Sequence, residues 1–205
     1  MKKFNTVIFD LDGVLIDSKK NMRNSWQKVK DVFLLSQSFD EYFRFVGYPF
    51  EIILNKIGIF QNIKRIKVLY AKESIRNVNY IKIHNGVIET IRKLKKNKIN
   101  IGIVTSKDLK RTKIILKKLK IPIETIICPK KKLKGKPFPD QLLLATKKLM
   151  SSKNKTCYVG DMYVDYQAAK NARVGFIFAK YGYGKKKSIF KNIIKKPRDI
   201  LKFTL

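Results

Sequence analysis

Short apolar runs alternate with amphipathic segments along most of the chain. Apolar runs of strand length occupy residues 6–9, 99–104, 125–128, 158–159 and 174–178. Segments with apolar residues at helical spacing lie between the later runs, over 86–96, 109–119, 139–150 and around 168–172. Continuous apolar runs of this length are typical of the buried strands of parallel sheets. The alternation therefore predicts an α/β fold built on a doubly wound parallel sheet.

The alternation is interrupted after the first apolar run. Its first helical segment carries an apolar stripe formed by Met22, Trp26, Val29 and Phe33. Asp17 and Ser18 precede this segment, and their side chains are suited to capping the amino end of a helix. No period-two strand pattern follows before about residue 81. We predict a helical domain over residues 18–81, inserted into a main domain formed by 1–17 and 82–205. A continuation of the main domain is the alternative.

Two aspartates follow the first apolar run, at a point where Gly13 permits a turn. The segment from Thr6 to Ser18 reads TVIFDLDGVLIDS and contains Asp10 and Asp12. Ligands of open α/β sheets bind outside the carboxyl ends of the strands, so this carboxylate pair is a candidate active site. The alternative is that both residues are ordinary turn acids, and this segment alone does not choose between the two.

The chain is strongly basic. Lys and Arg number 47 against 15 Asp and Glu, which gives a formal net charge of +32. Such a charge makes nucleic acid a partner to consider. The lysines are spread over nearly every predicted helix and loop, without an arginine-rich tract interleaved with aromatic residues. We interpret the charge as a compositional bias and expect no dedicated nucleic-acid partner.

Targeting and redox signals are weak. The first strand begins at once, and no apolar run approaches the roughly 18 residues that a membrane-spanning helix needs. We expect a cytoplasmic protein without a membrane partner. Cys128 and Cys157 stand far apart and lack metal-ligand spacing. They are predicted to be reduced, buried thiols.

Four short polar motifs follow the predicted strands in a fixed order. They read VIFDLDGVL, IVTSK, GKPFPD and VGDMYVDYQAAKNA. This series resembles the haloacid dehalogenase superfamily over essentially the whole chain. It is most similar to the subgroup with a helical cap between the first two motifs, which contains phosphoglycolate phosphatases and beta-phosphoglucomutases. The resemblance implies a Rossmann-like catalytic core and agrees with the predicted helical insertion, which would be the cap.

The resemblance also implies a role for each motif residue. Asp10 would be a nucleophile that forms an aspartyl-phosphate, and Asp12 would act as general acid and base. Thr105 would hydrogen-bond a phosphoryl oxygen, and Ser106 could offer its backbone N–H. Lys136 would neutralise charge shared between the phosphoryl group and Asp10.

A divalent ion is implied by the clustered carboxylates. Neighbouring carboxylates raise one another's pKa, so Asp10, Asp161 and Asp165 would be unfavourable together without a cation. Oxygen ligands and a phosphate substrate favour Mg²⁺. The expected ligands are Asp10, the backbone carbonyl of Asp12 and Asp161, with Asp165 binding through water or orienting its neighbours. The alternative for Asp161 and Asp165 is capping of the following helix.

The expected function is that of a Mg²⁺-dependent phosphatase acting on a small phosphorylated metabolite of the phosphoglycolate or sugar phosphate type. One alternative is a phosphomutase of the beta-phosphoglucomutase type. Another is a basic nucleic-acid-binding or scaffold protein on an inactive hydrolase fold. Within the cap, Arg44, Tyr48 and Glu51 are candidate specificity contacts, with packing or surface roles as the alternative. The sequence leaves open the substrate and the choice between monomer and homodimer.

Overall fold

The core of the protein is one parallel sheet. The computed structural model describes residues 3–185 and 187–204; residues 1, 2, 186 and 205 of the predicted core lie outside the described residues. Six strands pair in the order β5-β4-β1-β6-β7-β8, and all of the pairings are parallel. The strands are β1 (Thr6–Phe9), β4 (Asn100–Val104), β5 (Thr125–Ile127), β6 (Thr156–Gly160), β7 (Gly175–Ala179) and β8 (Ile193–Ile194). The predicted α/β fold with a parallel sheet is confirmed.

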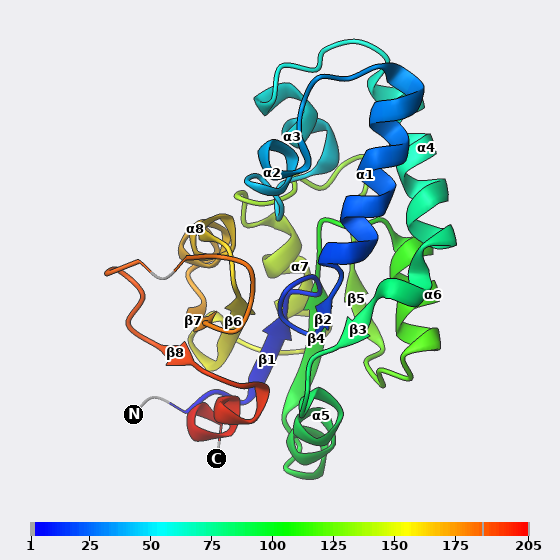
Figure 1. Cartoon of the computed structure of the whole chain (residues 1–205). Helices are drawn as coiled ribbons and strands as arrows, with labels where there is room; N and C mark the ends of the chain where they lie inside the picture. The colour runs from blue at the N-terminus through cyan, green and yellow to red at the C-terminus, as the bar shows by residue number, and fades with distance from the viewer. Residues whose placement is uncertain (1–2, 186, 205) are drawn as a thin grey trace.

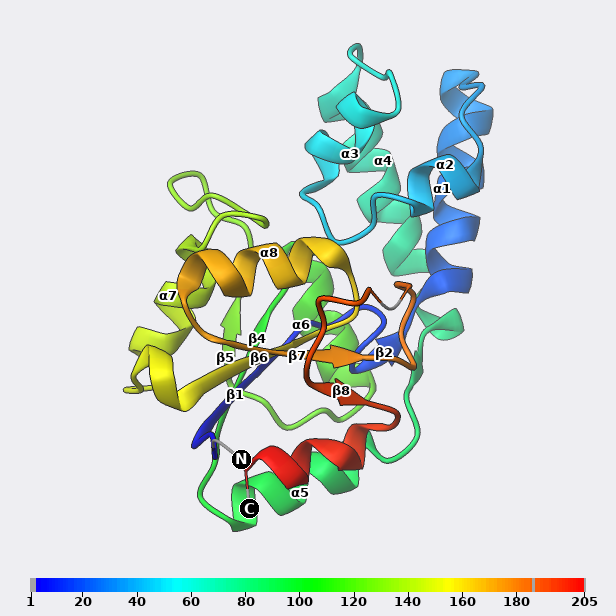
Figure 2. The same cartoon turned by 90° about the vertical axis from the view of Figure 1, so that its left-hand side faces the viewer.

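Helices cover both faces of this sheet (Figure 2). One face carries α5 (Val87–Lys96), α6 (Leu109–Lys118) and the 3-10 helix η3 (Pro197–Phe203), and the other carries α7 (Asp140–Lys148) and α8 (Tyr163–Ala172). Successive side chains of a strand point to opposite faces. In β1, Val7 and Phe9 accordingly join the first core cluster and Ile8 joins the second. Burial on both faces explains why β1 is apolar throughout.

Four helices interrupt the chain between β2 (Ile16–Asp17) and β3 (Lys82–Ile83). These cap helices are α1 (Lys19–Phe33), α2 (Phe39–Phe43), α3 (Phe50–Lys56) and α4 (Ile63–Arg76), followed by the 3-10 helix η1 (Val78–Tyr80). Figure 1 shows them as a group beyond the carboxyl end of β1, opposite the chain termini. Because β2 and β3 pair antiparallel, the two connections to the cap helices run side by side.

The cap helices enclose a hydrophobic core of their own. Its most buried members include Trp26, Leu54 and Ile66, and the rings of Trp26 and Tyr42 stack with centroids 4.6 Å apart. This cluster is separate from the two clusters on the faces of the sheet. The inserted helical cap is therefore confirmed as an architectural feature, while the domain boundaries at 17/18 and 81/82 stay a prediction.

One further 3-10 helix and two buried thiols belong to the core. A short 3-10 helix, η2 (Lys153–Lys155), precedes β6. Cys128 and Cys157 are buried and free, as predicted. Within residues 3–185 and 187–204, no helix has both the length and the apolar character needed to cross a membrane.

Candidate active site

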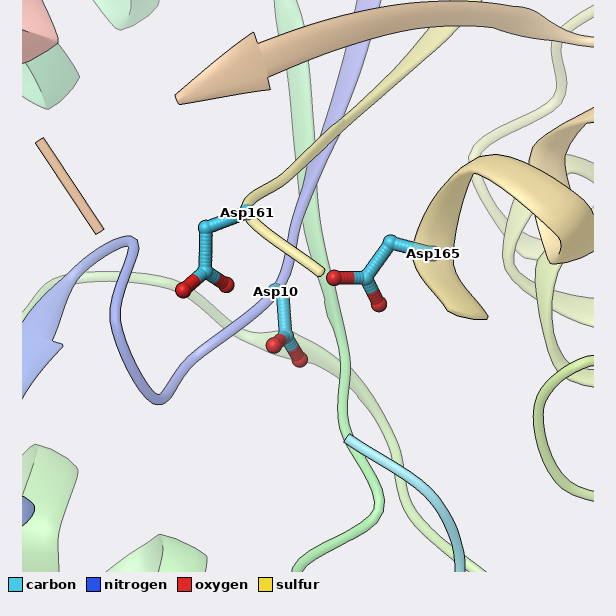
Figure 3. Close-up of side chains that lie close together, drawn as sticks. All are labelled: Asp10, Asp161 and Asp165. Carbon is cyan, nitrogen blue, oxygen red and sulfur yellow. The ribbon is translucent and has the colours of Figure 1, made fainter. Parts of the chain in front are cut away.

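The polar motifs meet at the carboxyl ends of neighbouring strands. Asp10 directly follows β1, Thr105 follows β4, Asp161 follows β6, and Asp165 lies in the first turn of α8. Since β1 lies between β4 and β6 in a parallel sheet, these three strands end at the same edge. Figure 3 shows the carboxylates of Asp10, Asp161 and Asp165 gathered at this edge. The order of motifs along the sequence thus becomes one cluster in space.

Lys136 joins two of the carboxylates. Its Nζ lies 2.9 Å from Asp10 Oδ1 and 2.7 Å from Asp165 Oδ1. The lysine comes from the basic loop before α7, yet it is only 1% exposed. Burial alone would lower the pKa of Lys136, but the charges of Asp10 and Asp165 outweigh this effect and raise the pKa above its ordinary value. Lys136 is therefore charged and compensates the buried carboxylates.

The pKa values of Asp10 and Asp161 are strongly perturbed by their surroundings. Burial raises the pKa of Asp10 to about 7, although Lys136 acts in the opposite direction. Burial, followed by the charges of Asp165 and Asp10, raises the pKa of Asp161 well above its ordinary value. Without a further cation, one lysine does not fully compensate three carboxylates held this close together.

The carboxylate cluster fits a divalent cation. One oxygen from each of Asp10, Asp161 and Asp165 lies within 4.8 Å of the others. Asp161 Oδ1 is buried and has no hydrogen-bond partner among the described residues. A buried acceptor left unpaired is costly, and an oxygen-only ligand set suits a hard cation such as Mg²⁺. Asp165 also accepts a hydrogen bond from the Met162 N–H at 2.9 Å, so it caps α8 as well as facing the cluster.

Asp12 is held by two side chains for which the sequence motifs predicted no site role. Ser18 Oγ donates to Asp12 Oδ1, and Lys107 Nζ lies 3.2 Å from Asp12 Oδ2. The predicted capping role of the Ser18 side chain is wrong, because its hydroxyl makes no cap bond with α1. The Ser18 backbone, at φ −116° and ψ 10°, lacks the extended conformation that usually lets an N-cap hydroxyl accept from the first N–H groups of a helix. The sequence feature that points to Lys107 as a site residue is its position directly after Thr105 and Ser106.

Thr105 and Ser106 occupy the strand end as predicted. Thr105 is 1% exposed, and its hydroxyl accepts a hydrogen bond from the Lys107 N–H at 3.2 Å. The Ser106 hydroxyl donates instead to the carbonyl of Gly47, between α2 and α3, at 2.6 Å. Ser106 therefore ties the end of β4 to the cap helices, and its backbone N–H remains the predicted phosphate contact.

A glycine-rich loop after β7 closes around Asp161. The Tyr183 N–H donates to Asp161 Oδ2 at 2.6 Å, and a Cβ added at Gly182 would lie 2.3 Å from the Cβ of Asp161. The Tyr183 hydroxyl accepts from the Ser18 N–H at 2.7 Å. These contacts join segments that are far apart in sequence. Tyr183 is thus a site residue that local pattern could not indicate.

A cavity of about 50 Å³ separates the cap helices from this edge of the sheet. Its lining includes Asp12, Lys107 and Arg111 from the core and Tyr42, Tyr48 and Tyr70 from the cap helices. Of the three predicted cap contacts, Tyr48 lies on this cavity. Arg44 and Glu51 are exposed, and Glu51 pairs with Lys67 at 2.9 Å. The specificity roles of all three stay predictions.

Comparison with known proteins decides the family. The sequence profile of haloacid dehalogenase-like hydrolases matches residues 7–179, which is most of the chain. The chain belongs to this family. The predicted membership of the haloacid dehalogenase superfamily, and of a family of hydrolytic enzymes, is confirmed.

Two relatives and one solved structure match most of this haloacid dehalogenase-like hydrolase. It is 28% identical to pyrophosphatase PpaX from Oceanobacillus iheyensis over 172 residues, 82% of this chain and 80% of that protein. It is 26% identical to a phosphoglycolate phosphatase from Aquifex aeolicus over 201 residues, 96% of this chain and 94% of that protein. A haloacid dehalogenase-like hydrolase structure from Bacteroides fragilis matches with a TM-score of 0.88 at 24% identity, covering 97% and 100% of the two chains.

The ion pairs of Lys136 lead to a stability prediction for this hydrolase. We expect Lys136→Met to lower the free energy of unfolding by about 3–5 kcal/mol in metal-free buffer, because Asp10 and Asp165 lose their buried counter-ion. Urea unfolding at neutral pH in the presence of a chelator measures this change. Lys132→Met, at an exposed position of the same loop, is the control and should change stability by less than about 0.5 kcal/mol. Equal midpoints for Lys136→Met and the unmodified protein would contradict the assigned ion pairs.

Proposed function

We propose that the protein is a Mg²⁺-dependent phosphatase that hydrolyses a small phosphorylated metabolite through an aspartyl-phosphate on Asp10. The observation that carries this proposal is the position of Asp10. It stands at the end of the central strand β1, 4% exposed, beside the buried ammonium of Lys136 at 2.9 Å. Asp161 and Asp165 complete a carboxylate cluster around it. A positioned nucleophile with adjacent charge stabilisation is what phosphoryl transfer requires of a protein.

In the first half-reaction, an Asp10 carboxylate oxygen attacks phosphorus as the bond from phosphorus to the leaving oxygen breaks. Asp12 donates a proton to that oxygen, so the alcohol or acid leaves uncharged at the cleaved position. In the second half-reaction, water attacks the phosphoryl group on Asp10, and Asp12 takes up the proton that the water loses. Inorganic phosphate leaves, and both aspartates return to their starting states.

The surrounding residues serve these two steps. Lys136 neutralises charge on Asp10 and the phosphoryl oxygens, and Thr105 and the Ser106 N–H donate hydrogen bonds to those oxygens. Ser18 and Lys107 orient the Asp12 carboxylate through the contacts described above. Asp10, the Asp12 carbonyl and Asp161, with Asp165 in support, would hold a Mg²⁺ ion, which would supply positive charge at the phosphoryl group. The Tyr183 N–H fixes the orientation of the Asp161 carboxylate.

The relatives support hydrolysis of small substrates. One is named a pyrophosphatase and another a phosphoglycolate phosphatase, and both align with most of this chain. A phosphomutase would use the same core residues but would rearrange its substrate without net release of phosphate. The two activities therefore differ in the product of a single assay.

The test is a panel of phosphoesters with free phosphate as the readout. We expect the purified protein with Mg²⁺ to release phosphate from at least one of phosphoglycolate, pyrophosphate, sugar phosphates, nucleotides and p-nitrophenyl phosphate. Asp10→Asn protein, purified in the same way, is the control for contaminating phosphatases. An absence of release across the panel would overturn the proposal, and an isomerised product without free phosphate would indicate a phosphomutase.

A further inference from the structure

Two buried basic side chains line the cavity below the cap helices. Lys107 is 6% exposed and Arg111 is 9% exposed, and both face this space of about 50 Å³. Basic side chains are rarely buried because removing their charge from water is costly. Lys107 finds a partner in Asp12. Arg111 plays no part in the phosphoryl transfer proposed above, and its burial has no explanation in that chemistry.

The guanidinium of Arg111 is fixed along one edge. Nε pairs with the Asp108 carboxylate, which also accepts the Arg111 N–H at 2.9 Å and so caps α6. The guanidinium carbon lies 5.4 Å from the centroid of the Tyr70 ring, and the Tyr70 and Tyr42 hydroxyls are hydrogen-bonded at 2.9 Å. Within residues 3–185 and 187–204, neither terminal nitrogen of Arg111 has a hydrogen-bond partner. These two terminal nitrogens are held in place and are available to donate hydrogen bonds to a ligand.

The cavity also lies on the leaving-group side of the reaction. Asp12, the proposed donor of a proton to the leaving oxygen, is part of its lining together with Arg111. A group attached to that oxygen must therefore extend into the cavity. The space is small, about 50 Å³, and suits a leaving group of a few atoms.

We propose that Arg111, supported by Lys107, binds a second anionic group on the substrate, a carboxylate or phosphate a few atoms from the transferred phosphoryl group. A planar guanidinium with two unused donors binds either group in a bidentate fashion. The Tyr70 ring packs against the guanidinium, and its hydroxyl is hydrogen-bonded to that of Tyr42. The inference rests on the proposed phosphatase function and names its substrate class as short bis-anionic phosphate compounds. Arg111 is then a specificity-determining residue.

The test compares substrates that differ in the second anion. Phosphoglycolate and ethyl phosphate have the same two-carbon length, but only phosphoglycolate carries a carboxylate; pyrophosphate supplies a phosphate instead. We expect Arg111→Met to lower kcat/KM by about 30-fold on phosphoglycolate or pyrophosphate, the effect of losing a charge-assisted bidentate contact. The loss on ethyl phosphate should be much smaller. The substrate with the larger ratio of unmodified to variant rate identifies the anion as carboxylate or phosphate.

Two further variants make the comparison decisive. Lys110→Met, at an exposed neighbouring position of α6, should leave kcat/KM unchanged on all three substrates. Arg111→Lys keeps the positive charge but cannot make a bidentate contact. Its kcat/KM on the anionic substrates should fall by an intermediate factor, which provides a readout if Arg111→Met folds poorly. Equal losses on ethyl phosphate and the anionic substrates would overturn the inference while the phosphatase proposal stands. Absence of phosphate release by the unmodified protein from every substrate would overturn the proposed function and this inference with it.

Discussion

Asp10→Asn is expected to lower the rate of phosphate release by at least about 10⁴-fold while the protein stays folded. An amide is no nucleophile towards phosphorus, so the covalent half-reaction is lost, and losses of this order follow removal of a nucleophile in other enzymes. The fold should persist because an amide resembles the protonated carboxyl that burial already favours at this position. Single-turnover and steady-state phosphate assays measure the loss.

The matched control is Asp31→Asn, which makes the same chemical change at an exposed position of α1. It should retain the full rate. A rate for Asp10→Asn near that of the unmodified protein would remove Asp10 as the nucleophile. A loss confined to KM would assign Asp10 to substrate binding instead.

The same variant should also change how stability depends on pH. In the metal-free protein burial raises the pKa of Asp10 from 3.8 to about 7. The contribution of Asp10 to stability is then fully present below pH 4 and is lost as the pH rises through about 7. With chelator present, the free energy of unfolding by urea should decline less steeply between pH 4 and 7 for Asp10→Asn than for the unmodified protein, and identical slopes would contradict the raised pKa.

Removal of divalent ions should abolish phosphate release, and added Mg²⁺ should restore it. The prediction rests on the crowding of Asp10, Asp161 and Asp165 and on the unpaired oxygen Asp161 Oδ1. Bound Mg²⁺ also stabilises the folded state by mass action, by about 2.7 kcal/mol at a concentration 100 times Kd. The thermal midpoint should therefore rise with Mg²⁺, which gives a readout that is independent of activity.

The control for this experiment is Asp161→Asn. It removes a proposed ligand, so its midpoint should rise much less with Mg²⁺ than that of the unmodified protein. NaCl at matched ionic strength separates site binding from general screening of a chain with a net charge of +32. Full activity after exhaustive chelation, together with midpoints indifferent to Mg²⁺, would contradict a metal site.

Local pattern was sufficient for the sheet and for the main carboxylates. The apolar runs predicted β1, β4, β5 and β7 to within about one residue at each end, because a buried strand must be apolar along its length. Asp10 follows such a run directly and Asp161 follows one after Gly160, so their meeting at one sheet edge follows from parallel pairing. The strands β2, β3 and β8 have two residues each, and no periodic pattern can be read from so few positions.

The partners of these residues depended on packing between distant segments. The GKPFPD motif singles out Lys136 only through the family resemblance, and the hydrophobic pattern of the basic loop does not show that this lysine is buried between Asp10 and Asp165. Tyr183 reaches Asp161 from a loop 22 residues later, and Arg111 packs against Tyr70 of α4.

Sequence therefore determined the elements, their order and the chemical types at the strand ends, because hydrophobic period and turn chemistry act between near neighbours. Burial, charge pairing and the shape of the cavity were settled by the folded chain. The physical reason is that the cost of removing a charge from water, and the partner that offsets it, depend on what packs against the side chain from elsewhere in the sequence.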